Sequence, residues 1–142
     1  MSNLSKPSLP LVLKTTAILI IPIVIVNALL FFLGQLIDAF GPTITTPEGS
    51  PITLAAVAIA SLIGSLICLG IYLLIRRLST APGKWVSRVG YFLLFLSFFN
   101  PLAVENGNIL TFLTLNAMHV VVALPFIQVF NKLSRTSPTE IS

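Results

Sequence analysis

The chain is short of charged residues. Only 8% of its 142 residues are charged, four of them acidic, whereas 56% are hydrophobic. A soluble domain carries about 25% charged residues, so this chain cannot cover a water-facing surface in the usual way. The composition therefore predicts a protein whose solvent is a lipid bilayer. The net charge of +4 does not indicate nucleic-acid binding, because the eight basic residues flank apolar segments instead of forming one patch.

Residues that commonly carry chemistry are also scarce. Cys68 is the only cysteine and His119 the only histidine. A single cysteine excludes an internal disulfide and paired-cysteine redox chemistry. One histidine without cysteine or carboxylate partners is a poor metal site within one chain. No nucleophile–base pair or phosphate-binding loop is recognisable, so we expect no enzyme, no metal and no cofactor.

Long apolar segments dominate what remains. A hydrocarbon core about 30 Å thick needs roughly 20 apolar residues in a helix. The first segment is longer than the apolar part of a signal peptide, so it is interpreted as a retained span. We predict one all-α integral membrane domain over residues 1–142, with four spans at 13–37, 52–75, 86–102 and 109–130.

The connections between the spans are short and rich in helix-ending residues. They read "AFGPTITTPEGSP", "RRLSTAPGK" and "AVENGN". Short connections make consecutive helices antiparallel neighbours, which predicts a transmembrane four-helix bundle. Ser50 and Pro51 are predicted to form the N-cap and first turn of the second span. Asn108 is predicted to be the N-cap of the fourth.

All eight basic residues fall on one predicted side of the membrane, before span one, around the second connection and after span four. They are Lys6, Lys14, Arg76, Arg77, Lys84, Arg88, Lys132 and Arg135. The positive-inside rule then predicts a cell-membrane protein with both termini in the cytoplasm. Tyr72, Trp85 and Tyr91 fall near the same side, where we expect them to be aromatic anchors at the interface.

Small residues recur at four-residue spacing in the second span, at Ala56, Ala60, Gly64 and Cys68. Such a ridge lets a neighbouring helix backbone approach closely. Two interpretations stay open from the sequence. The ridge packs against another helix of the same subunit, or it is the seam of a homo-oligomer.

Three polar residues within the spans are candidate ligand-binding residues. Asn27 is deep in the first span, and Asn116 and His119 are three residues apart on the fourth, so they are neighbours on its surface. An ionisable residue near the bilayer midplane is a functional hypothesis by default. Burial in hydrocarbon favours neutral His119. His119 bonds a serine, an asparagine or a backbone carbonyl on another span, or it contacts a ligand or substrate, or, least favoured, it holds a metal or haem.

The stretches that surround these residues resemble a known family. Trp85 at the start of span three, "LSFFNPL" at its end and "LNAMHVVVALP" in span four are similar to a small bacterial family of four-span membrane proteins, catalogued as a domain of unknown function. The resemblance covers roughly residues 15–133 and rests chiefly on Ser97, Pro101, Met118 and His119. It implies four helices and a bacterial membrane, and it implies no chemistry.

The sequence thus favours a non-enzymatic integral membrane protein that acts as a scaffold or binds lipid or a partner. The alternative is a transporter or a binder of small hydrophobic ligands. Its cavity would lie between spans one and four, lined by the ligand-binding residues Asn27, Asn116 and His119. Small multidrug exporters are disfavoured because they need a glutamate in span one, where this chain has no acidic residue before Asp38.

Overall fold

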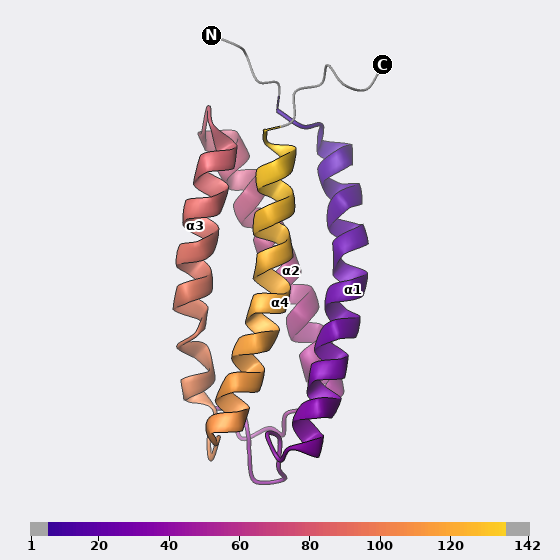
Figure 1. The fold of residues 1–142 in the computed structure, drawn as a ribbon, viewed down its shortest axis with the longest axis vertical. Helices are drawn as coiled ribbons and strands as arrows, with labels where there is room; N and C mark the ends of the chain where they lie inside the picture. Colours follow the sequence, from indigo (N-terminus) through magenta and orange to yellow (C-terminus); the bar gives the residue numbers. More distant parts are fainter. Residues whose placement is uncertain (1–5, 136–142) are drawn as a thin grey trace.

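The computed structural model describes residues 6–135, so the predicted domain of residues 1–142 extends beyond it at both ends. It contains four long helices and a short 3₁₀-helix, η1, and no strand between residues 6 and 135 (Figure 1). The elements are α1 (Leu9–Leu36), α2 (Leu54–Leu78), α3 (Pro82–Ser97), η1 (Asn100–Ala103) and α4 (Ile109–Leu133). The predicted all-α fold with four apolar helices is confirmed.

The helices form an up-and-down bundle in which consecutive helices run antiparallel (Figure 1). α4 packs against the other three long helices, whereas α1 and α3 do not meet. α1, α2, α4 and the combined α3–η1 segment are each long and apolar enough to cross a membrane. Their outward faces carry large exposed apolar side chains such as Ile21, Phe92 and Ile109. Such a surface suits the hydrocarbon of a bilayer, and the chain is a multi-pass membrane protein.

Side-chain caps determine where α2 and α4 begin. The prediction that Ser50 and Pro51 start α2 is wrong, because both lie in the connecting loop and Thr53 is the N-cap. The Thr53 hydroxyl accepts a hydrogen bond from Ala56 N at 3.2 Å. The predicted N-cap of α4 is confirmed: Asn108 Oδ1 accepts from the backbone N of the fourth-span residue Thr111 at 2.9 Å.

The third span is interrupted where the sequence suggested one continuous segment at 86–102. α3 starts earlier, with Pro82 in its first turn, where the missing N–H costs nothing. It ends at Ser97, and the chain continues as η1. Pro101 explains the interruption, because it offers no backbone donor and disfavours helical geometry at Asn100.

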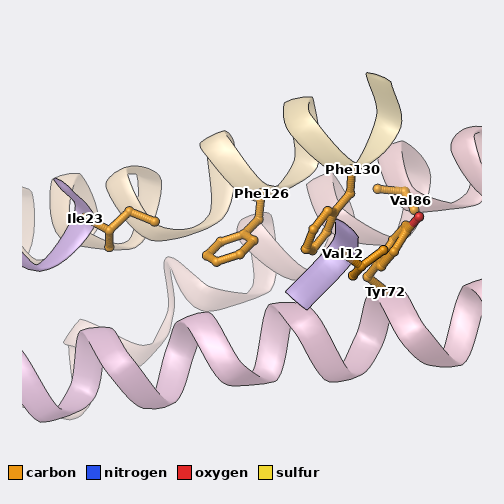
Figure 2. Packing of buried hydrophobic residues seen from close by; sticks show 6 residues of the cluster. All are labelled: Val12, Ile23, Tyr72, Val86, Phe126 and Phe130. Carbon is orange, nitrogen blue, oxygen red and sulfur yellow. The ribbon is translucent and has the colours of Figure 1, made fainter. Parts of the chain in front are cut away.

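One apolar cluster lies in the half of the bundle that carries the basic residues. It contains Val12, Ile23, Tyr72, Val86, Phe126 and Phe130 (Figure 2). The rings of Tyr72 and Phe130 stack with centroids 4.2 Å apart. Tyr72 is only 1% exposed, and its hydroxyl lies 3.3 Å from Ser134 Oγ. The prediction that Tyr72 is an interfacial anchor is therefore wrong, because its ring packs in the core and its hydroxyl has a partner inside the protein.

A second cluster closes the opposite end, around the turn after α1. The ring of Phe40 folds back and stacks on Phe31, with centroids 5.4 Å apart. The turn is made by Asp38, whose φ is 56°, and by Ala39 N donating to Gly34 O at 2.8 Å. A Cβ on Gly34 would lie 2.5 Å from Phe40 Cε2, so glycine permits this approach. The cluster holds the end of α1 against α4.

Candidate functional site: a groove between α2, α3 and α4

A groove of about 370 Å³ runs along the bundle between α2, α3 and α4, with Asn27 of α1 at one end. It is partly open. The lining side chains of Ile67 on α2 and Leu93 on α3 are exposed, so the open side lies between these two helices. The walls are almost wholly apolar and include Ala60, Ile71, Leu94, Val122, Ala123 and Phe126. The described residues contain no group of three or more His, Cys, Asp or Glu side chains that could hold a metal.

Small residues explain the shape of the groove. A Cβ on Gly64 would lie 3.3 Å from Val122 Cγ1, and one on Gly90 would lie 2.5 Å from Ile127 Cγ1. These glycines let α4 approach both α2 and α3 closely. Ala60 and Cys68, one turn on either side of Gly64, leave space beside it and line the groove. Of the ridge of small residues, Gly64 thus serves packing within one subunit, and a homo-oligomer seam stays a prediction.

Asn27 is the most buried polar side chain of the groove wall, at 2% exposure. Its Nδ2 donates to Ser61 Oγ at 2.8 Å and lies 3.5 Å from the Met118 carbonyl oxygen. The Ser61 hydroxyl itself donates to the Val57 carbonyl at 2.7 Å, so it offers only lone pairs to Asn27. These partners orient the amide, since both are acceptors that require its NH₂ group. Asn27 Oδ1 is buried and has no hydrogen-bond partner among residues 6–135.

His119 lies on the groove wall and bonds within its own helix, not to another span as one prediction had it. Its Nδ1 is 2.7 Å from the Leu115 carbonyl oxygen. A carbonyl can only accept, so Nδ1 carries a proton, and with the proton there Nε2 has a lone pair in an uncharged imidazole. No hydrogen bond to Nε2 occurs within residues 6–135.

Asn116 is the one predicted site residue that the groove leaves out. Its Nδ2 donates to the Phe112 carbonyl at 3.0 Å on the same helix. The structure therefore brings Asn27 and His119 to one groove and keeps Asn116 apart. The groove also differs in place from the cavity expected between spans one and four, because α1 and α4 are in direct contact there through Asn27 and Met118. That any of the three binds a ligand stays a prediction.

Ser97 on α3 is a groove residue that sequence reasoning noted only as part of a motif. Its hydroxyl donates to the Leu94 carbonyl at 2.7 Å, as serines in helices often do. The signal that could have found this wall is Gly90, seven residues before Ser97, which lies on nearly the same face of the helix. In the part of the chain that the structure describes, no Asp, Glu, Lys or Arg lines the groove.

Comparison with known protein families places the chain. Residues 8–136 match the family of unknown function DUF6069. The chain belongs to this family. The resemblance to an uncharacterised four-span family is thereby confirmed, and DUF6069 brings no activity with it. No curated protein and no solved structure matches the chain.

Proposed function

We propose that this DUF6069 protein is a non-enzymatic membrane protein that binds a lipid or another small hydrophobic molecule in the groove between α2, α3 and α4. The groove carries the proposal. Its volume of about 370 Å³ falls within the range of about 300–1,000 Å³ of small-molecule sites. Like those sites, it combines apolar walls with a few polar groups.

The position of the groove supports a ligand that arrives from the bilayer. The three helices that form it are long and apolar enough to span a membrane. Its open side, between α2 and α3, faces outward from the bundle, where lipid would lie. Within the described residues 6–135, no Asp, Glu, Lys or Arg lies in its walls. A hydrophobic molecule could therefore enter sideways without passing through water.

A non-enzymatic role is favoured by the bonding of the groove hydroxyls. Ser61 and Ser97 each donate to a carbonyl of their own helix. The imidazole of His119 makes its bond to Leu115. Neither serine is thus paired with the histidine, and nucleophilic catalysis requires such a pair.

The proposed orientation has both termini in the cytoplasm of a cell membrane. The eight basic residues lie at or near the end where α1 begins and α4 ends, whereas Glu48 and Glu105 lie in the loops at the opposite end (Figure 1). The positive-inside rule assigns the basic end to the cytoplasm.

Native mass spectrometry of the full chain, released gently from its own membrane, tests the proposal. Ala60→Phe places a ring in the groove, and Ala55→Phe is the matched control because Ala55 is exposed on the same helix outside the groove. We expect a bound mass on the wild type and on Ala55→Phe that is largely lost from Ala60→Phe. A bare wild-type protein, or a bound mass that Ala60→Phe does not change, would contradict groove binding and favour the scaffold role.

A further inference from the structure

Three polar side chains of the groove, Asn27, Ser97 and His119, have free positions that accept hydrogen bonds. Asn27 is only 2% exposed, and its Oδ1 has no hydrogen-bond partner among the described residues. Buried polar atoms in native proteins are nearly always paired, because an unpaired one costs free energy. Since Ser61 and Met118 hold the amide by its NH₂ group, the orphan atom is an acceptor and needs a donor.

His119 and Ser97 present acceptors as well. The Leu115 carbonyl takes the proton on His119 Nδ1, which leaves the Nε2 lone pair. The Leu94 carbonyl takes the Ser97 hydroxyl proton, which leaves the lone pairs of Oγ. A ligand that suits these three side chains must donate hydrogen bonds.

Among residues 6–135 the groove lining has no Asp, Glu, Lys or Arg, which restricts the kind of donor group further. An ammonium head group would find no carboxylate among the lining residues. The oxygens of a carboxylate or phosphate head group are acceptors, so they could not bond to the acceptors of Asn27, Ser97 and His119. Such a group would also lose its hydration without gaining a cationic partner, which costs free energy. A neutral hydroxyl group meets neither difficulty.

The acceptors lie at one level, and apolar wall extends from them towards the basic end. The Met118 carbonyl, 3.5 Å from Asn27 Nδ2, belongs to the residue before His119. Along α2, the lining continues from Ser61 to Ile75, which is about 21 Å at a rise of about 1.5 Å per residue. This geometry suits a slender apolar body with its polar group near Asn27.

We propose that the groove binds an apolar molecule with a neutral hydroxyl group, which donates a hydrogen bond to Asn27 Oδ1 or His119 Nε2. This inference rests on the proposed function, since it names the chemistry of the molecule that the groove holds. The long body lies against Ile71, Tyr72 and Phe130, towards the basic end of the bundle.

Two probes that differ only in the donor test the inference. The full chain, purified in detergent, is titrated with oleyl alcohol and with oleyl methyl ether, and native mass spectrometry gives the bound fraction of each. The ether keeps the chain and the oxygen but cannot donate. We expect the alcohol to bind about tenfold more tightly, which corresponds to about 1.4 kcal/mol and is the scale of one or two net hydrogen bonds.

Substitutions then locate the acceptors. His119→Phe and Asn27→Leu each reduce the preference for the alcohol while leaving binding of the ether nearly unchanged, and His119→Gln, which offers an amide oxygen, restores part of it. Asn116→Leu is the matched control. Asn116 also has a buried Oδ1 without a partner, but it lies off the groove, so its substitution leaves the preference intact.

The outcomes separate this inference from the proposed function. Equal binding of alcohol and ether by the wild type overturns the hydroxyl and leaves groove binding standing. Binding of neither probe also overturns it, and the Ala60→Phe comparison then decides separately whether groove binding survives. A preference that persists in both His119→Phe and Asn27→Leu overturns the assignment of these acceptors. A third probe, dioleoylglycerol, carries its hydroxyl on a molecule with two chains. Comparing its affinity with that of oleyl alcohol shows whether the groove prefers a two-chain lipid or a one-chain alcohol.

Discussion

All four helices are apolar, but two of their contacts differ in how tightly they are closed. The α1–α4 contact is held by hydrogen bonds, whereas the α2–α3 contact lies beside the groove. α1 and α4 are joined through Asn27 and the Met118 carbonyl, and Thr111 on α4 donates to the Ala39 carbonyl just beyond α1 at 2.6 Å. The hydrogen bonds of residues 6–135 include none that joins α2 to α3. The first contact is closed, and the second borders the groove.

This difference teaches what brings membrane helices together. Lipid tails are as apolar as leucine, so apolar side chains alone give two helices little reason to prefer each other over lipid. Close contact requires small residues that admit a neighbour or polar groups that bond to it. Gly64 of α2 and Gly90 of α3 each admit a side chain of α4, not each other's helix, and no hydrogen bond between residues 6 and 135 joins α2 to α3. The space that remains between α2 and α3 is available to another molecule.

The largest effect is expected from closing the space at Gly34. Gly34→Ala would place a Cβ 2.5 Å from Phe40 Cε2 and 3.2 Å from Thr114 Cγ2. The buried Phe40 ring is stacked on Phe31 and cannot move freely, so unfolding in detergent should become easier by about 1–3 kcal/mol. Gly70→Ala is the control, because a Cβ there meets nothing within 4 Å. This control substitution should increase the free energy of unfolding by roughly 0.5–1 kcal/mol, because alanine has the higher helix propensity. Equal effects in the two variants would refute the claim that the end of α1 is closely packed.

The next effect is expected at Thr111, which is 1% exposed and holds the start of α4 to the end of α1. Thr111→Val keeps the shape but loses the bond to the Ala39 carbonyl and the bond from Asn108 N at 3.1 Å. Stability should fall by about 0.5–2 kcal/mol, the usual cost of a lost cap. Denaturant unfolding followed by circular dichroism measures it. Thr114→Val, on the same helix and without a hydrogen bond of its side chain, should be close to neutral. A neutral Thr111→Val would show that the caps do not hold this end together.

The smallest effect compares a serine at the closed contact with one at the open side. Ser61→Ala removes the acceptor that Asn27 uses at 2.8 Å and should destabilise by about 0.6 kcal/mol, the average for a hydrogen bond between membrane helices. Ser97→Ala removes only a bond to its own helix, so we expect less change than for Ser61→Ala. The same unfolding assay, run on both variants together, resolves the difference. A larger loss for Ser97→Ala would reverse the contrast between the two contacts.

Part of the fold and of the site could be predicted. Four helices follow from the length of the apolar segments, and the cap at Asn108 follows from a local rule that needs no neighbours. The start of α2 was missed, because Ser50 and Thr53 are both good caps and the loop pairing of Thr45 with Pro51 decides between them. Burial of Tyr72 was missed because its stacking partner, Phe130, is far along the chain.

The sequence by itself determined that the chain crosses a membrane as helices, because hydrocarbon leaves backbone groups no partner except each other. It also determined that all the basic residues lie at one end of the bundle. The lengths of the spans and their antiparallel order are enough to place each of these residues. Only the tertiary structure decided where the bundle is closed and where it is open. That depends on which helix faces meet, and the sequence of a uniformly apolar helix does not show which face meets which neighbour. Asn27 and His119 both line the groove, whereas Asn116, one turn from His119, does not.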